Sequence, residues 1–133
     1  IAAILRVDAC ITIHAVEVNM PLFMNLEQRY GIGNYNVTLT HEDFLRVQRD
    51  GYFDRIVMNP PFVNGSDIKH IEHALTMLKP GGRLVAICAN GPRQREKLKP
   101  LAENSGGWWE DLPAGTFKES GTAVNTALLL IEG

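Results

Sequence analysis

The 133-residue sequence predicts an α/β fold built on a mostly parallel β-sheet. Short runs rich in β-branched residues alternate along the chain with segments whose apolar residues recur at helical spacing. This alternation is typical of a sheet whose parallel strands are joined by crossover helices. The last two strand-like runs have no room for a helix between them. We therefore expect them to form an antiparallel hairpin at the edge of the sheet.

The first half of the chain alternates between helix and strand patterns in a regular way. Pro21 suits the first turn of a helix, where the backbone N–H groups have no partner within the helix, and Gly31 suits its end, because glycine is common just after the last helical residue. The two prolines at 60 and 61 end the last strand of this half. The expected elements, in order, are the tail of a helix at 1–7, a buried strand at 11–18, a helix at 21–30, a short strand at 37–40, a short helix at 42–49 and a strand at 55–58.

The second half contains the clearest helix of the sequence. Ser66 is a good N-cap residue, and it is followed by four apolar residues at helical spacing: Ile68, Ile71, Leu75 and Leu78. Residues 80–82 (Pro-Gly-Gly) are expected to end this helix. The elements expected after it are a buried strand at 83–89, a helix at 94–103, a turn at 106–107, and strands at 108–112 and 123–131 joined by a loop at 113–122.

Composition and charge exclude several classes of protein. The net charge of −2 argues against a chain that binds nucleic acid through a broad basic face, although a nucleic-acid substrate is still compatible with it. No apolar run reaches the roughly 18 residues of a membrane span, and no signal peptide is visible, so no membrane partner and a cytoplasmic location are expected. Cys10 and Cys88 both lie in apolar stretches and are expected to be reduced core residues. The four histidines show no metal-ligand spacing with these cysteines, so no metal site is predicted.

Polar residues follow the predicted strands, at the positions where parallel α/β sheets bind ligands. Four such groups occur in succession: Glu17 with Asn19, Asp43 with Phe44, the segment 59–62, and Asn90 with Gly91.

The segment Asn59, Pro60, Pro61 and Phe62 is the strongest of these signals. Two consecutive prolines fix the backbone and remove two N–H donors, which leaves the preceding carbonyls without ladder partners. The Asn59 amide oxygen and the Pro60 carbonyl can then accept both hydrogens of a planar amine, while Phe62 stacks on the group that carries it. The alternative is a rigid strand-to-loop turn with Phe62 in the core.

The order of these groups resembles the class I S-adenosylmethionine-dependent methyltransferases, which have a Rossmann-like sheet. The resemblance covers essentially the whole chain and rests on Glu17, Asp43, the Asn-Pro-Pro-Phe motif at 59–62, and the Leu-Lys-Pro-Gly-Gly turn at 78–82. The motif is most similar to that of the amino-methyltransferases, which act on adenine N6 or cytosine N4 in DNA, guanine N2 in ribosomal RNA, or protein glutamine N5.

The resemblance implies a role for each residue of the predicted site. Glu17, supported by Asn19, would accept hydrogen bonds from the ribose hydroxyls of S-adenosyl-L-methionine. Asp43 would accept from the adenine amine, and Phe44 would pack on that ring. The segment 59–62 would hold the target amine, with Asn59 also beside the cofactor. The alternatives are a solvated strand-end charge for Glu17, a helix cap for Asp43 and a core position for Phe44.

One departure from the family concerns the first strand and its glycine-rich loop, which would precede the helix tail at 1–7. Gly31 and Gly33 superficially resemble that loop, but they follow a helix and precede a strand, so we reject them. Residues 1–133 are accordingly interpreted as a single methyltransferase catalytic domain that is N-terminally incomplete. Two strands would then have open edges, which favours a homodimer through these edges and predicts weak or absent cofactor binding.

The resemblance favours an enzyme that methylates a nucleic-acid base, with adenine N6 in DNA ahead of RNA. Ribosomal RNA guanine N2, protein glutamine N5 and a non-catalytic fragment are the alternatives; a nucleotide-dependent oxidoreductase would not explain the motif at 59–62. The basic residues Arg93, Arg95, Lys97 and Lys99 suit either a phosphate contact or a solvated helix face. Some aminomethyltransferases use the region of Trp108, Trp109 and the loop 117–122 in their target pocket, although at least one Trp is expected in the core.

Overall fold

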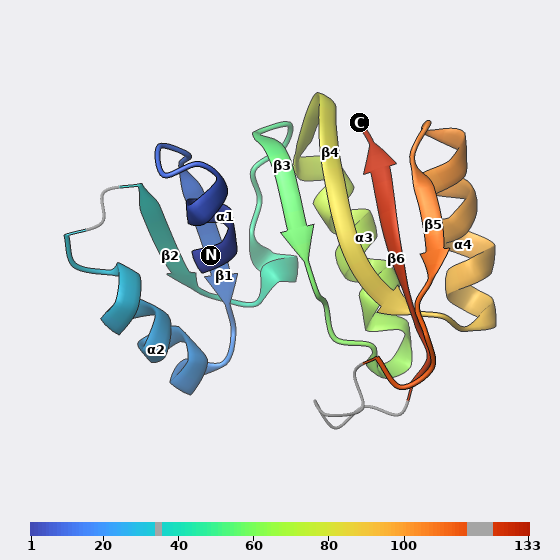
Figure 1. Cartoon of the computed structure of the whole chain (residues 1–133), viewed down its shortest axis with the longest axis horizontal. Helices are drawn as coiled ribbons and strands as arrows, with labels where there is room; N and C mark the ends of the chain where they lie inside the picture. Colours follow the sequence, from blue (N-terminus) through green and yellow to red (C-terminus); the bar gives the residue numbers. More distant parts are fainter. Residues whose placement is uncertain (34–35, 117–123) are drawn as a thin grey trace. The chain divides into compact units, whose positions relative to one another are not determined.

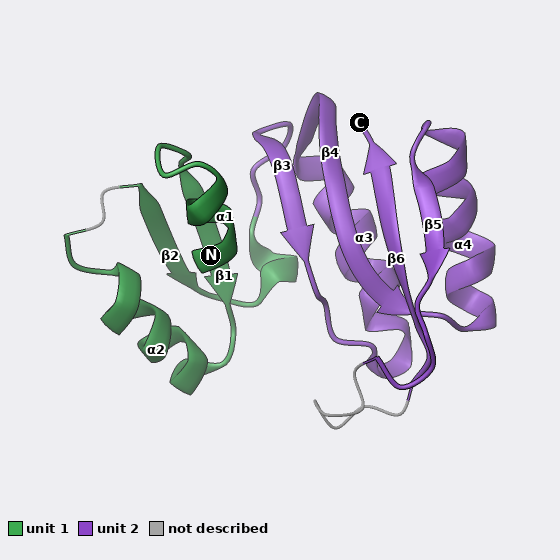
Figure 2. Ribbon diagram, in the orientation of Figure 1, with its two compact units in different colours: residues 1–47 green, residues 48–133 purple. Residues whose placement is uncertain are grey.

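The computed structural model describes residues 1–33, 36–116 and 124–133. It divides into two compact units, Ile1–Val47 and Gln48–Gly133 (Figure 2). No helix of the described residues is both long enough and apolar enough to cross a membrane.

The first unit is a two-stranded parallel sheet with short helices. Its elements are α1 (Ala2–Val7), β1 (Ile13–Glu17), α2 (Met20–Tyr30), β2 (Val37–His41) and the 3-10 helix η1 (Phe44–Arg46). β1 and β2 pair in parallel from Ile13 opposite Val37 to Glu17 opposite His41. The predicted helix with proline in its first turn and its end at Gly31 is confirmed as α2. No described residue of this unit is fully buried.

The second unit is a four-stranded sheet with two helices (Figure 1). Its elements are β3 (Phe53–Met58), the 3-10 helix η2 (Val63–Gly65), α3 (Ser66–Met77), β4 (Leu78–Ala89), α4 (Pro92–Asn104), β5 (Trp108–Asp111) and β6 (Thr126–Glu132). The strand order is β3-β4-β6-β5; β3 and β4 are parallel, and β6 is antiparallel to both β4 and β5. The α/β class, the largely parallel pairing and the C-terminal antiparallel hairpin are therefore confirmed.

The core lies between one face of this sheet and the helices α3 and α4. Alternate residues of β4 and β6 are buried on that face. α3 packs against β4 and α4 packs against β6 and β5, and each helix contributes fully buried side chains, such as Ile71 and Leu98. Burial of each such aliphatic side chain contributes about 1.5–3 kcal/mol. Gly107 lets β5 approach β6 closely, because a Cβ at this position would overlap the Leu130 carbonyl.

The strands at the two ends of each sheet, β1 and β2 in the first unit and β3 and β5 in the second, pair on one side only within the described ranges. Among the described residues β1 pairs only with β2, and β3 pairs only with β4, so each of these strands has one edge without a ladder partner.

Three local predictions are corrected by the structure. The helix expected at 42–49 is only the single turn η1, because this segment has no buried face to stabilise a longer helix. Ser66 is not the N-cap: Gly65, with a φ of 71°, holds that position, and Ser66 is the first helical residue. The turn at 80–82 does not end α3, which stops at Met77, and lies instead within β4.

Two expectations about individual side chains are also wrong. Cys88 is buried as expected, whereas Cys10 is exposed. Neither tryptophan belongs to the core: Trp108 is 41% exposed on the edge strand, and Trp109 is half-buried with its indole N–H directed at Asp111. The loop at 117–122 lies outside the described residues.

Candidate functional site

The first unit brings two carboxylates to the carboxyl edge of its sheet. Glu17 ends β1 and is half-buried, and its Oε1 accepts a hydrogen bond from the Asn19 N–H at 2.8 Å. Asp43 follows β2, and its Oδ1 accepts from the Leu45 N–H at 3.0 Å, so this residue does cap η1. In the described part of the chain neither the Glu17 Oε2 nor the Asp43 Oδ2 has a protein donor. Each carboxylate therefore keeps one oxygen for a ligand.

The other two residues predicted in this unit support the same edge. Asn19 caps α2, with its Oδ1 accepting from the Leu22 N–H at 3.0 Å. Phe44 is half-buried in η1. The edge is further held by His41, whose Nε2 lies 3.0 Å from the Val18 carbonyl oxygen. A half-buried ring beside two carboxylates suits a nucleoside, because the ring can cover a base while the carboxylates accept from amine and hydroxyl groups.

The second unit places the segment 59–62 directly after β3. Asn59 is exposed, Pro60 is buried and Phe62 is half-buried. No hydrogen bond to the Asn59 amide is found among the described residues. The prolines fix the backbone on either side of the Pro60 carbonyl. The segment thus exposes the Asn59 side chain and has an aromatic residue three positions later in the chain.

The backbone after this segment adopts a conformation that the sequence analysis missed. Asn64 has φ 54° and Gly65 has φ 71°, so two successive residues are left-handed just before α3 begins. Asn and Gly are the residues that adopt this region at least cost. The Asn-Gly pair at this position is the signal that could have predicted the turn. We call residues 59–65 the acceptor loop.

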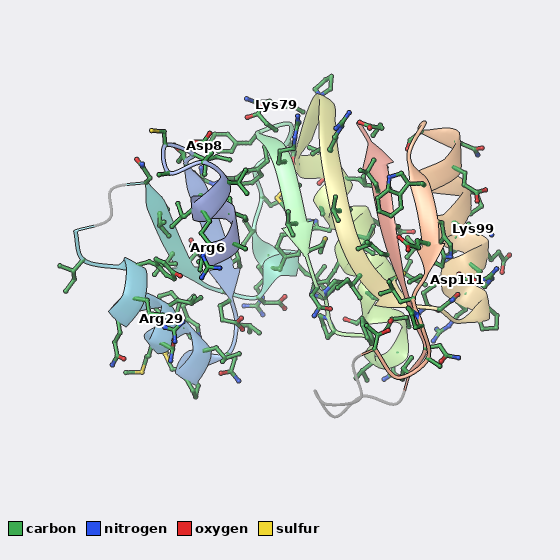
Figure 3. All side chains as sticks on the ribbon, viewed as in Figure 1. Arg6, Asp8, Arg29, Lys79, Lys99 and Asp111 are labelled. Atoms are coloured by element: carbon green, nitrogen blue, oxygen red, sulfur yellow. The ribbon has the colours of Figure 1, made fainter. Side chains whose placement is uncertain are left out.

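A second polar group at the carboxyl edge of the four-stranded sheet was also missed. Three donors converge on Asp111 Oδ1: the Trp109 Nε1 at 2.8 Å, the Asn90 Nδ2 at 3.0 Å and an Arg95 guanidinium nitrogen at 3.1 Å. The Trp109 hydrogen bond is the main cause of a lowered pKa for the Asp111 carboxyl, with Asn90 and Arg95 adding to it. Figure 3 shows Asp111 at the end of β5, opposite the end of the sheet where Lys79 lies.

The basic cluster on α4 forms pairs with its own neighbours. Besides the Arg95 contact with Asp111, Lys99 lies 3.9 Å from Glu103 one turn along the helix. Arg93 and Lys97 are exposed. Two of the four basic residues are thus paired with carboxylates, and the other two are exposed to solvent. No group of three His, Cys, Asp or Glu side chains that could hold a metal ion occurs in the ranges that the structure describes.

A buried carboxylate close to the acceptor loop completes the site. Asp67, the second residue of α3, is 0% exposed and hydrogen-bonded to three donors. It lies on the same helical face as Ile71 and Ala74, and a charged residue on an apolar face is the signal that could have identified it. Burial, and secondly the Asp67 charge, raise the pKa of the neighbouring Cys88 thiol to about 12.

The predicted site residues therefore fall into two sets. Glu17, Asn19, Asp43 and Phe44 gather at the carboxyl edge of the sheet in the first unit, and the acceptor loop follows the carboxyl end of β3 in the second unit.

Comparison with known proteins gives one family and many structures of the same fold. The model of the family described as "Methyltransferase small domain" matches residues 2–106. The comparison with curated protein sequences found no match.

Solved structures similar to this chain include two TYW2 proteins. TYW2 from Pyrococcus horikoshii, in complex with MeSAdo, is 20% identical, with a TM-score of 0.63 over 91% of this chain and 47% of that one. TYW2 from M. jannaschii, in complex with AdoMet, is 17% identical, with a TM-score of 0.66 over 97% of this chain and 60% of that one.

A protein described as a [4+2]-cyclase has a similar fold. The cyclase SpnF is 17% identical, with a TM-score of 0.62 over 97% of this chain and 69% of that one. At these identities the likeness shows the fold alone, and the chain spans about half to two thirds of the length of these structures.

Proposed function

Because this chain belongs to the methyltransferase small domain family, we propose that it acts in S-adenosylmethionine-dependent methyl transfer to an amino nitrogen. The observation that carries the proposal is the exposed Asn59 amide at the carboxyl end of β3, without a hydrogen-bond partner among the described residues. It is followed by two prolines and a half-buried Phe62. Because the Asn59 side chain is exposed, a ligand amine can reach its amide oxygen by replacing water.

The residues of the first unit fit the cofactor. The free oxygen of Glu17 would accept from the ribose hydroxyls and that of Asp43 from the adenine amine, with Phe44 against the adenine ring. Asn19 orients Glu17 through its N–H. The complexes of two TYW2 proteins with MeSAdo and AdoMet support a cofactor of this type on this fold. When bound, the cofactor supplies a sulfonium methyl group that is already a strong electrophile.

The acceptor loop would bind and aim the amine. The Asn59 Oδ1 and the Pro60 carbonyl oxygen each accept one amine hydrogen, which leaves the nitrogen lone pair pointing away from the loop. The same two oxygens stabilise the positive charge that develops on nitrogen as the new bond forms. Phe62 stacks on the planar group that carries the amine. The methyl–sulfur bond would break as the methyl–nitrogen bond forms, S-adenosylhomocysteine would leave, and the methylated nitrogen would then lose one proton to water. Most of the catalytic effect would thus come from alignment and electrostatics, and no general base would be needed in the bond-forming step.

The substrate that we propose is an exocyclic amine of a nucleic-acid base, with adenine N6 in DNA as the first candidate. A planar heteroaromatic amine would stack on the Phe62 ring and donate its two hydrogens to the two oxygens of the acceptor loop. A base in a duplex would have to leave the stack, at a cost of a few kcal/mol, to reach Phe62. Guanine N2 in ribosomal RNA and glutamine N5 in a protein present the same pair of amine hydrogens and are the other outcomes of the test.

The test combines binding and transfer. The proposal requires saturable binding in a calorimetric titration of the purified protein with S-adenosylhomocysteine, whereas the sequence predicts weak or absent binding. Transfer of a labelled methyl group is then measured with adenine-containing DNA, ribosomal RNA and a release-factor-type protein as acceptors, and DNA should be labelled. Labelling of RNA or protein alone would change the substrate class. Binding without labelling of any acceptor would refute the transfer proposal, and absence of binding would favour a non-catalytic module.

The Asn59→Ala variant locates the acceptor group. Loss of one pre-organised transition-state contact lowers the turnover rate about 10²–10³-fold. The affinity for S-adenosylhomocysteine should not change. Asn25→Ala, which removes an exposed amide from α2, is the matched control and should leave both quantities unchanged. Equal turnover of Asn59→Ala and Asn25→Ala would exclude Asn59 from the reaction.

A further inference from the structure

A buried carboxylate joins three elements beside the acceptor loop. Asp67 Oδ1 accepts from the Ile68 N–H at 2.9 Å, and Oδ2 accepts from the Ala89 N–H at 2.9 Å. The Gln94 Nε2 donates to both oxygens, at 3.1 and 3.3 Å. The donors come from the first turn of α3, the last residue of β4 and the first turn of α4.

This arrangement is a costly way to stabilise a fold. Asp67 is 0% exposed, and no ion pair to it occurs among the described residues, so its charge is balanced only by N–H dipoles and the amino end of α3. An apolar residue that packed well would avoid the loss of hydration. A buried polar group, however, fixes one geometry, because each of its bonds has a narrow range of distance and direction.

Asp67 fixes the geometry of the acceptor loop and of the edge of the sheet beside it. The acceptor loop runs directly into α3, so the first turn of α3 is the distal anchor of that loop. β3 and β4 are parallel neighbours, with Met58 opposite Ala86, and their carboxyl ends meet at one edge of the sheet. The acceptor loop begins at the end of β3 and ends at the start of α3. The hydrogen bond from the Ala89 N–H to Asp67 therefore links the start of α3 to the end of β4, the strand next to β3.

The start of α4 is part of the same connection. Gly91 precedes α4, and a Cβ at this position would lie 2.8 Å from the Gln94 Oε1, so the Gln94 amide packs directly on the Gly91 backbone. Gln94 is 5% exposed, and its Nε2 is held by the bonds to Asp67. The Asp67 carboxylate thus has a buried donor from the start of α4.

We infer that Asp67 is a positioning residue for methyl transfer: its carboxylate holds the acceptor loop against the ends of β4 and α4, so that Asn59 meets the amine in one fixed orientation. This inference rests on the proposed function. Asp67 does not contact the amine itself; it acts through the loop.

The variant that tests this role is Asp67→Asn. The amide keeps the shape of the side chain but replaces one acceptor by an NH2 group, which then faces an N–H donor. The matched control is Ser105→Ala. Ser105 Oγ accepts from the Glu132 N–H at 3.0 Å, so this change also leaves a strand N–H without its side-chain acceptor, at the opposite edge of the same sheet.

Two measurements separate positioning from general stability. In hydrogen exchange, Asp67→Asn should speed exchange in peptides that cover 59–66 and 88–91, and Ser105→Ala should leave those peptides unchanged. In transfer to adenine-containing single-stranded DNA, Asp67→Asn should lower kcat up to about 10²-fold, the loss expected for a displacement of about 1 Å. The affinity for S-adenosylhomocysteine should stay the same in both variants.

The possible failures can be told apart. Uniformly faster exchange in Asp67→Asn, or an unchanged kcat, would overturn the positioning role. If the unmodified protein transfers no methyl group, the proposed function fails, and the exchange measurement alone decides whether Asp67 holds the loop. If Asp67→Asn does not fold, Gln94→Leu removes a single donor to the same carboxylate and should speed exchange in the same peptides to a smaller extent; no local change there would refute the inference.

Discussion

Replacement of Gly65 by alanine tests whether the left-handed turn in the acceptor loop serves the reaction. Gly65 has a φ of 71°, a region that costs an L-residue about 1–2 kcal/mol. The new Cβ would lie 3.2 Å from an Arg93 guanidinium nitrogen, which can move away because the Arg93 side chain is exposed and flexible. The expected loss of folding free energy is therefore the backbone strain alone, about 1–2 kcal/mol. Urea unfolding should show a lower midpoint with an unchanged slope.

The matched control is Gly106→Ala. Gly106 has a φ of 88°, and a Cβ there would meet nothing within 4 Å, so this variant carries similar strain away from the loop. The two variants should lose similar stability, but only Gly65→Ala should lower the methyl-transfer rate, because relief of its strain moves the residues before α3. Equal transfer rates in the two variants would refute the link between this turn and the alignment of the amine.

Three further predictions concern other parts of the molecule. A thiol reagent should label Cys10 in the native protein and reach Cys88 only after unfolding; rapid labelling of both thiols in the native protein would contradict the burial of Cys88. Burial raises the pKa of the Cys88 thiol from 9.0 to about 12. The contribution of this thiol to the free energy of unfolding is therefore present below pH 9 and is lost as the pH rises towards 12. The pKa of the Asp111 carboxyl, followed by NMR, should lie below 3.8 and rise towards that value in Trp109→Phe, which removes the largest cause of the shift; an unchanged pKa would exclude the indole bond. Amides of Ile1–Val47 should exchange faster than those of the second unit, and S-adenosylhomocysteine at 100 times its dissociation constant should protect them by up to about 2.7 kcal/mol; equal protection without ligand would contradict the burial pattern.

The elements that the sequence predicts well are those whose signal is local. The helix after Pro21 has a fixed start and a glycine at its end, and it lies close to the expected position. The strands on either side of α3 contain the expected apolar runs, 56–58 and 84–89, but each strand begins earlier than expected, at Phe53 and Leu78. The helix expected at 42–49 failed because its apolar spacing meets no partner surface, and a short helix without one is not stable. The sequence of this segment could not show that no partner surface would lie against it.

The sequence predicts those site residues that directly follow a predicted strand. Asn59 follows a strand and precedes two prolines, and both facts are visible in the sequence. Asp67 is different, because a carboxylate at the start of a helix usually faces solvent and favours the helix dipole. Its burial depends on Gln94, 27 residues away, and on the end of β4. The Asp111 cluster likewise depends on how β5 pairs with β6, which sets where the indole of Trp109 points.

The distribution of burial fits a division of labour between the two sets of residues. All of the described core side chains belong to the second unit, and the helix that anchors the acceptor loop contributes Ile71, Ala74 and Met77 to it. Alignment of an amine needs such a rigid support, because pre-organised acceptors must not reorganise when charge develops. A carboxylate such as Glu17, which in the proposed function only binds the cofactor, can lie on a less buried unit, since the ligand itself would contribute to its order. The buried Asp67 network is thus found on the unit where loss of geometry would cost the most in rate.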